Sequence, residues 1–442
     1  MQRNFYILNL KMAGIKNIED KIELSFYKKT IKNDFDPEKY KAKAIYGENG
    51  SGKTAIITSV KLLQNIILDK RYLADTDTQK TLHELVNKKT RKGFVECEFY
   101  SSWDDTKYIF KYFVSFEINA EERFVITAEK LEFKNGNYSK NEYILVYETC
   151  AGKLIYYIDE YRFGELKNET LNLLNQQSFA SCIFSSDIMS TPLPVEYVYI
   201  LNLILFAVSI YVSIDNEDNH KPYFVKKKFG EMSEEEWNKL GMDYISEAYT
   251  KLLVKDDSDE MILKIRFESY QEQVRKMCSF IQIFKPELVD IDIDKKDNGN
   301  YYKCSLIMVY DNYSLDSEFE SRGIKKLMAL FTYLNSASNG SIVFIDELDS
   351  NINDVYLDKI LEHFLYYGKG QLCFTAHNLS PMSVLKGNKN AISFISSINT
   401  VHTWTNNGNQ SPENAYRNGF IEDSPFNVDA SDFLGIIGGE DE

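Results

Sequence analysis

The chain has 442 residues, of which 44% are hydrophobic and 14% aromatic, and its formal net charge is −15. This composition can fill the cores of about two to three domains, and it does not fit a chain that is disordered as a whole. The acidic excess argues against a protein that coats nucleic acid without sequence preference, because such binding relies on many contacts between Lys or Arg and phosphate.

Short basic stretches at 87–93 and 225–230 are the candidates for a local basic patch, although lysine runs are more often solvated surface. The six cysteines lie far apart, without a Cys-x-x-Cys motif or a Cys/His cluster at metal spacing. They indicate reduced thiols and imply no zinc site. The first residues lack the architecture of a signal peptide, so we expect a cytoplasmic protein.

The chain opens with two predicted strands joined at residues 12–17, and apolar residues alternate along the second strand. A strand, a glycine-rich loop and a helix follow. Apolar residues recur along one stripe of that helix, at Ile56, Val60, Leu63 and Ile67.

The glycine-rich loop, "GENGSGKT" at 47–54, fits the pattern G-x-x-x-x-G-K-[ST] without a mismatch. The backbone N–H groups of such a loop, at a helix N-terminus, wrap the phosphates of a nucleotide. We expect Lys53 to reach the β- and γ-phosphates and Thr54 to bind Mg²⁺. The predicted nucleotide-binding residues are Gly47, Glu48, Asn49, Gly50, Ser51, Gly52, Lys53 and Thr54.

Residues 93–165 read as short strands separated by turns, which favours antiparallel hairpins. The next segment, 166–300, is mainly helical in its pattern. It contains an apolar run at 197–214 whose length approaches that of a membrane span. We favour a buried helix, because the run contains Asn202 and Ser209 and has no second span to accompany it.

The C-terminal part reads as a strand and then as helix, strand, helix and strand, the order typical of a parallel sheet with crossover helices. The two ends of the chain therefore predict one α/β sheet. Its halves are 1–92 and 301–442, interrupted by an antiparallel β lobe at 93–165 and a largely helical insertion at 166–300.

Two carboxylates follow the apolar stretch 342–345, which is typical of a parallel strand buried on both faces. Asp346 is placed to hold Mg²⁺ through water, and Glu347 to orient and polarise an attacking water as general base. The alternative is an exposed acidic turn after a core strand. The glycine-rich loop upstream makes that alternative less favourable.

His377 follows the next predicted strand, where one class of nucleotide hydrolases places a γ-phosphate sensor; a purely structural histidine is the alternative. Ser321 and Gly323 lie at the N-terminus of the helix before the acidic strand, which makes a second anion-binding helix end. Ser321 is either only an N-cap or part of a site for the γ-phosphate held by another copy of the chain. We favour the second interpretation.

Four motifs, in this order and separation, resemble those of the ABC-type ATPase heads of the SMC, RecF and OLD group: "GENGSGKT", "ESRGIKKL", "FIDELDSNIND" and "FTAHN". The closest likeness is to the compact AAA-type ATPases of bacterial phage-defence systems, of the abortive-infection and PARIS kinds, whose signature commonly reads Glu-Ser-x-Gly-x-Lys-[RK]-Leu. The likeness covers residues 1–90 and 300–442. It implies an ABC-ATPase head with a P-loop parallel sheet and an antiparallel β lobe.

The resemblance also implies ATP and Mg²⁺ as ligands. ATP would be sandwiched between two heads, and Ser321, Gly323 and Lys325 of one copy would complete the site of the other. The loop "LDSNIND" would couple the two sites, and a glutamine of the insertion, Gln176 or Gln177, would sense Mg²⁺.

Two departures from the pattern leave the hydrolysis rate and the dimer geometry open. Arg322 stands where the commoner signature has a second glycine, and Asn353 stands where transporters carry Asp.

The favoured function is an ATP-binding and ATP-hydrolysing sensor or scaffold subunit of an anti-phage defence system. It would form a homodimer or a higher homo-oligomer and control a separate effector, such as a Toprim-type nuclease. The stretch after His377 is too short for the Toprim nuclease that OLD proteins carry fused to the head. The alternative is a RecF/SMC-like ATPase that binds DNA in repair or maintenance; a transporter ATPase fits the β-rich lobe poorly.

Overall fold

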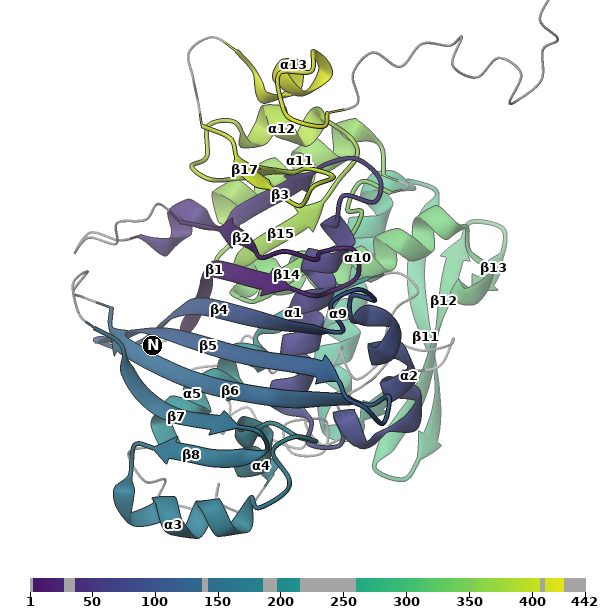
Figure 1. Ribbon diagram of the computed structural model, residues 1–442. Helices are drawn as coiled ribbons and strands as arrows, with labels where there is room; N and C mark the ends of the chain where they lie inside the picture. Colours follow the sequence, from purple (N-terminus) through teal and green to yellow (C-terminus); the bar gives the residue numbers. More distant parts are fainter. Residues whose placement is uncertain are drawn as a thin grey trace, which may run out of the picture.

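The computed structural model describes residues 3–27, 36–136, 142–185, 197–214, 260–350, 352–405 and 410–424. These residues form a mixed α/β molecule with three sheets and helices packed between and around them (Figure 1). The expected α/β class, with a parallel sheet beside an antiparallel one, is confirmed.

The central sheet has the strand order β17-β16-β3-β15-β14-β9. The strands β9, β14, β15, β3 and β16 run parallel to one another, and β17 is antiparallel to β16. The strand bounds are β3 (Ala42–Tyr46), β9 (Ile210–Ser213), β14 (Ile342–Ile345), β15 (Gln371–Thr375), β16 (Ile392–Ile395) and β17 (Val401–Thr403). Because the five parallel strands share one direction, the loops at their carboxyl ends gather at one edge.

Both faces of this sheet are buried, since successive side chains along a strand point to opposite faces. One face packs against α1 (Lys53–Leu68) and the antiparallel sheet, and its residues include Ile45, Phe344 and Cys373. The other face packs under the C-terminal helices, through residues such as Ala44, Val343 and Leu372.

The antiparallel sheet has the order β2-β1-β4-β5-β6-β7-β8. The hairpins expected between 93 and 165 are confirmed. The assignment of all of 1–92 to the central sheet was wrong for the two opening strands, because β1 pairs antiparallel with β4 and with β2 and so extends this sheet. The strand bounds are β1 (Asn4–Ala13), β2 (Ile22–Ser25), β4 (Lys92–Trp103), β5 (Thr106–Ile118), β6 (Phe124–Asn135), β7 (Ile144–Cys150) and β8 (Lys153–Tyr157).

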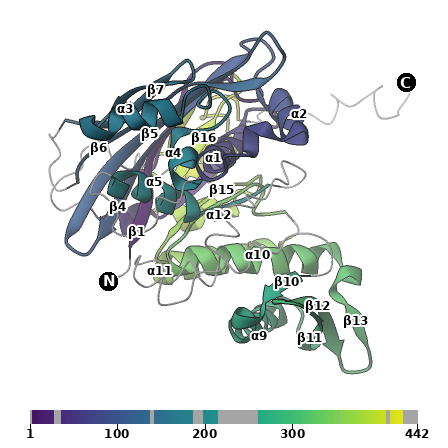
Figure 2. The same ribbon diagram turned by 90° about the horizontal axis from the view of Figure 1, so that it is seen from below.

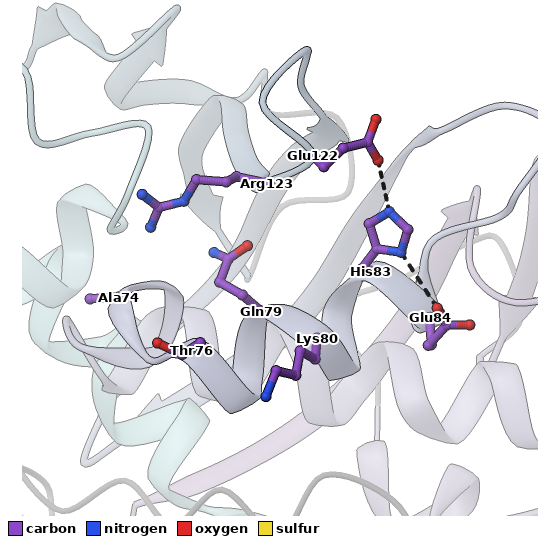
Figure 3. A pocket seen from close by; sticks show the side chains of 8 residues that line it. All are labelled: Ala74, Thr76, Gln79, Lys80, His83, Glu84, Glu122 and Arg123. Atoms are coloured by element: carbon purple, nitrogen blue, oxygen red, sulfur yellow. Dashed lines mark hydrogen bonds and ion pairs between the residues drawn. The ribbon is translucent and has the colours of Figure 1, made fainter.

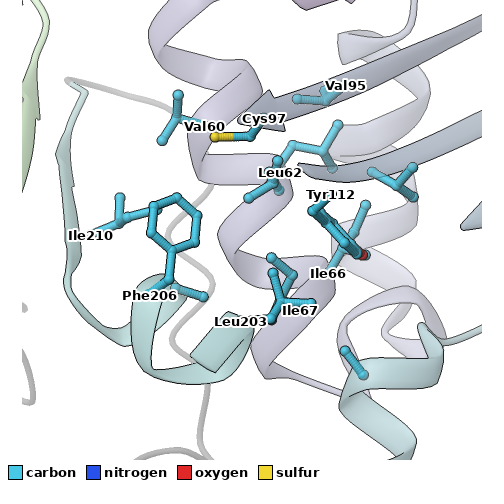
Figure 4. Packing of buried hydrophobic residues seen from close by; sticks show 14 of the residues in the cluster. Val60, Leu62, Ile66, Ile67, Val95, Cys97, Tyr112, Leu203, Phe206 and Ile210 are labelled. Atoms are coloured by element: carbon cyan, nitrogen blue, oxygen red, sulfur yellow. The ribbon is translucent and has the colours of Figure 1, made fainter. Parts of the chain in front are cut away.

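Helix α1 lies between the two sheets and is buried nearly all round, not only along the predicted stripe. It packs against α4 (Phe179–Ser185) and α5 (Tyr197–Val208). Figure 4 shows side chains of α1 meeting those of β4 and α5, among them Val60, Cys97 and Phe206. The remaining helices of this part are α2 (Thr76–Leu85) and α3 (Glu160–Glu169).

The apolar run 197–214 is buried as expected, but it is not one helix. Helix α5 ends at Val208, and residues 210–213 form strand β9, which pairs in parallel with β14. A continuous apolar run fits a buried helix and a buried parallel strand equally well, so periodicity could not separate the two. Segment 166–300 therefore contributes an edge strand to the central sheet. Among the described residues, no helix combines the length and apolar character needed to cross a bilayer.

A third, small antiparallel sheet has the order β10-β12-β11, with β13 paired to β12. Figure 2 shows this sheet and α9 on the outer side of α10. The bounds in this half are β10 (Glu260–Leu263), α9 (Phe267–Phe284), β11 (Leu288–Asn298), β12 (Tyr301–Tyr310), β13 (Ser314–Asp316), α10 (Arg322–Asn339), α11 (Asp354–Tyr367), α12 (Ser380–Leu385) and α13 (Pro412–Arg417). The helix–strand–helix–strand order predicted after residue 320 is confirmed.

A buried carboxylate fastens α4 to the antiparallel sheet. Glu129 on β6 is 0% exposed and accepts hydrogen bonds from the hydroxyls of Tyr112 (3.0 Å) and Tyr147 (2.6 Å) and from the N–H of Phe179 (2.6 Å). Burial raises the pKa of the Glu129 carboxyl, and these hydrogen bonds oppose that rise. Three donors from three elements therefore depend on one side chain.

Replacing that carboxylate should weaken the fold. We expect Glu129→Ala to lower the free energy of unfolding by about 3 kcal/mol or more, because it leaves a cavity and three buried donors without an acceptor. The matched control is Glu117→Ala on the exposed face of β5, expected within about 0.5 kcal/mol of the parent. Urea unfolding of both variants measures the difference; equal stabilities would contradict the role given to Glu129.

Candidate functional site

The glycine-rich loop connects β3 to α1, so its backbone curls over the carboxyl end of a central strand. Lys53 is the first residue of α1 and is only 7% exposed. Its Nζ donates to the carbonyl oxygens of Gly47 (2.6 Å) and Glu48 (3.0 Å). The loop therefore closes on its own lysine, whose ammonium joins the end of the loop to its beginning.

Two glycines of the loop are required by geometry. Gly52 has φ +108°, and a Cβ there would lie 2.3 Å from Cδ1 of Ile18. A Cβ on Gly47 would lie 2.4 Å from the carbonyl oxygen of Ile395. Any larger residue at either position would push the loop away from the strands and the turn beneath it.

Neighbouring segments support the loop from outside. The Asn17 side-chain amide donates to the carbonyl of Gly50, and the Asn399 amide donates to that of Ser51 at 3.3 Å. The Ser51 Oγ is buried and has no hydrogen-bond partner within the described part of the chain. A buried hydroxyl of this kind needs a polar partner, which a bound phosphate group can supply.

The acidic pair lies at the same edge, held by a threonine of the neighbouring strand. Ile345 pairs with Phe374 in the β14–β15 register, so the next residues face each other. The Thr375 hydroxyl donates to Asp346 Oδ1 (2.5 Å) and accepts from the N–H of Glu347 (2.8 Å). This one hydroxyl sets the position of both acidic residues.

Glu347 itself adopts φ +51°, a left-handed conformation that side chains other than glycine rarely take. Its side chain is exposed, whereas Asp346 beside it is half-buried. Backbone of this kind occurs at functional sites and also in ordinary turns, and Glu347 lies in the turn that follows β14.

Charge links the lysine to the acidic residues. Burial lowers the pKa of the Lys53 ammonium, and the negative charge of four nearby carboxylates opposes that lowering: Asp346, Glu347, Asp349 and Glu48. Lys53 is thus one positive charge among several carboxylates. This arrangement suits a negatively charged ligand that is bound together with a cation.

His377 is exposed just beyond β15, and a carboxylate fixes its backbone. Asp349 Oδ2 accepts hydrogen bonds from the N–H groups of His377 (2.8 Å) and Asn378 (2.6 Å). The loop after β14 and the loop after β15 are therefore joined. Asn353 caps α11, because its Oδ1 accepts from the N–H of Val355 at 3.0 Å.

Ser321 caps α10, as the structural alternative predicted: its Oγ accepts from the N–H of Ile324 at 3.3 Å. Its own N–H donates to Glu320 (3.0 Å), so neither hydrogen bond reaches the glycine-rich loop of the same chain. Lys325 donates to the carbonyl of Glu318 at 3.0 Å. At Gly323 an added Cβ would meet no atom within 4 Å, so the fold of one chain does not require glycine there.

The expected Mg²⁺ site uses two oxygen-bearing side chains, the half-buried Thr54 at the start of α1 and Asp346 at the end of β14. Oxygen donors are what a hard cation prefers, so these residues fit such an ion. In the described ranges, no group of three or more His, Cys, Asp or Glu side chains is arranged to hold a metal.

The two glutamines suggested as Mg²⁺ sensors lie elsewhere. Gln177 precedes Ser178, whose hydroxyl donates to the carbonyl of Ile66 near the far end of α1 (2.7 Å). Ile66 stands about 20 Å along the helix from Lys53. The suggestion that Gln176 or Gln177 senses Mg²⁺ was therefore wrong. The part of segment 166–300 that does lead to the site edge is strand β9, which lies within the apolar run 197–214.

The basic stretch 87–93 is balanced by glutamates. Lys88 pairs with Glu84, Lys89 with Glu19 and Arg91 with Glu122, at 2.8 to 2.9 Å. These exposed pairs form a mixed-charge surface, not a basic patch. The second stretch, 225–230, lies outside the described residues.

A separate open pocket of about 670 Å³ lies between α2 and the β5–β6 turn (Figure 3). His83 in its wall contacts Glu122 at 3.0 Å and Glu84 at 3.5 Å. None of the residues predicted for the site lines this pocket. Its lining residues are Ala74, Thr76, Gln79, Lys80, His83, Glu84, Glu122 and Arg123.

The predictions missed Thr375 and Asp349, which position the predicted residues. A signal existed for Thr375, the last residue of the strand before His377: parallel pairing places it opposite the acidic pair.

The chain matches no model of a known protein family, and a search of curated proteins gave no significant match.

Proposed function

We propose that the chain binds and hydrolyses ATP at the carboxyl edge of its central sheet. The observation that carries the proposal is the meeting of Lys53, Asp346 and Glu347 at one edge, although most of the chain separates the lysine from the acidic pair. A glycine-rich loop with a lysine at the head of a buried helix is the arrangement that phosphates require. An acidic pair next to it is what a metal-assisted attack by water requires.

In this proposal the loop N–H groups and Lys53 hold the phosphates, and Lys53 exchanges the carbonyls of Gly47 and Glu48 for phosphate oxygens. Thr54 and Asp346 would hold Mg²⁺, which when bound neutralises charge on the phosphate oxygens. Glu347 accepts a proton from water. The water oxygen forms a bond to the γ-phosphorus as the bond to the bridging oxygen breaks, giving ADP and inorganic phosphate.

We also propose that the site is completed by a second copy. Ser321, Gly323 and Lys325 lie at the exposed N-terminus of an 18-residue helix. Gly323 has no neighbour that forbids a side chain, so its lack of one leaves room for a ligand. Two heads, each presenting this helix end to the nucleotide of the other, would account for the glycine, the serine cap and the helix dipole together.

The wider role follows from the family resemblance of the head segments. We propose an ATP-controlled sensor or scaffold of a phage-defence system, which governs a separate effector protein, a nuclease. A RecF/SMC-like DNA clamp is the second candidate. The paired cations of 87–93 give that candidate no support, because they are not free to bind a phosphate backbone without breaking their ion pairs.

Removing the general base should separate binding from turnover. We expect Glu347→Gln to bind ATP with Mg²⁺ but to hydrolyse it about 10²–10⁴-fold more slowly, because the amide cannot accept the proton of water. Lys53→Ala is the comparison variant and should lose nucleotide binding. Phosphate release and equilibrium binding measure the two effects; undiminished turnover in Glu347→Gln would rule out the role assigned to it.

A bulky cation at the helix end should block assembly. Ser321→Arg should bind ATP as the parent does yet fail to associate in the Glu347→Gln background, since the side chain fills the space for the partner's nucleotide. Ser314→Arg, on exposed strand β13, is the matched control and should associate normally. Light scattering with and without ATP reports the mass. Association of the Ser321 variant would show that this helix end is not an interface.

Purification of Glu347→Gln from its native host in ATP tests the wider role. We expect one stoichiometric protein partner, and we expect Lys53→Ala, purified in parallel, to lack it because its heads cannot close. Mass spectrometry and nucleic-acid staining identify what is bound. Duplex DNA without a protein partner would favour the RecF-like clamp instead.

A further inference from the structure

The residue before Ser321 is a buried carboxylate with partners from two other elements. The Glu320 side chain is 4% exposed, and its oxygens lie 3.3 Å from Nζ of Lys285. The hydroxyl of Tyr310 and the N–H of Ser321 also donate to it. Lys285 is the C-cap residue that follows α9, and Tyr310 is the last residue of β12, so Glu320 ties the start of α10 to the small sheet and its helix.

Burying a carboxylate costs free energy, so a contribution to stability does not by itself explain Glu320. Burial by itself would raise the pKa of the Glu320 carboxyl, but the hydrogen bonds from Tyr310, Ser321 and Lys285 together lower it. The Lys285 ammonium also lies over the Tyr310 ring, 4.5 Å from its centroid. A fully satisfied buried network of this kind fixes a unique geometry more than it adds free energy.

The network fixes the position of the exposed N-terminus of α10. Ser321 and Arg322 are exposed and Gly323 is half-buried, whereas Glu320 directly beneath is buried. The N–H of Ser321 donates to the carboxylate, so Ser321 cannot shift without breaking that bond.

We propose that Glu320 is a positioning residue, which acts through Ser321 on the nucleotide bound by the partner copy. This inference rests on the proposed function. The small sheet is then the support of the shared site: Lys285 and Tyr310 hold Glu320, and Glu320 holds Ser321 at the distance that the second head needs.

The test measures ATP turnover first for single variants and then for mixtures of two variants. Glu320→Gln should bind ATP normally but turn it over about 10–100-fold more slowly, because a small displacement of a positioned group has an effect of that size. Glu318→Gln, an exposed carboxylate two residues upstream, is the matched control and should behave as the parent does. Thermal melting identifies a variant that does not fold; Tyr310→Phe, which removes only one hydroxyl, then replaces Glu320→Gln.

Mixing Glu320→Gln with Lys53→Ala should raise turnover above that of either variant alone, to at most about one quarter of the parent value. At most half of the dimers then hold one site built from an intact loop and an intact helix end, because Lys53→Ala brings no nucleotide of its own. Mixing Glu320→Gln with Ser321→Arg should restore nothing, since both damage the same side of the interface. A defect that only loosened the fold would not show this selectivity.

Three outcomes separate the hypotheses. Parent-like turnover of Glu320→Gln alone would overturn this inference and leave the proposed function standing. Rescue by Ser321→Arg but not by Lys53→Ala would also overturn it, because it places Glu320 in the site of its own chain. Absence of turnover and of association in the parent protein would overturn the proposed function, and this inference with it.

Discussion

The parallel direction of β3, β15, β14 and β9 is the constraint on which the rest of the molecule depends. It brings the ends of four strands, from distant parts of the chain, to one edge of one sheet. The Thr375 hydroxyl then converts this alignment into a defined site, because it contacts Asp346 and the backbone of Glu347 at once. Without the shared direction, the lysine and the acidic pair would lie at opposite ends of the sheet.

The glycine-rich loop and the acidic pair at this edge are held in different ways. The loop around Lys53 is held by its own carbonyls, by two asparagine amides and by close contacts that only glycine allows. Glu347, in contrast, has a left-handed backbone and an exposed side chain. The edge thus combines a loop held by many contacts with an exposed carboxylate beside it.

The three sheets have different tasks in this arrangement. The central sheet brings Lys53 and the acidic pair to one edge, and the antiparallel sheet covers one of its faces and buries α1 between them. The small sheet supports α10 and anchors Glu320 through Lys285 and Tyr310. The glycine-rich loop and the N-terminus of α10 therefore lie on separately supported parts of the fold.

The sequence by itself determined the glycine-rich loop, the hairpins and the acidic strand end, because each depends on residues that are neighbours in the chain. Turn residues, alternation and loop glycines act over short windows. Only the tertiary structure decided that 210–213 is a strand, that Thr375 clamps the acidic pair and that Glu320 is locked by Lys285. Those outcomes depend on pairing between distant segments. An apolar run does not show which strand it pairs with, and the place of Thr375 at a strand end becomes a signal only once β14 and β15 are known to pair in parallel.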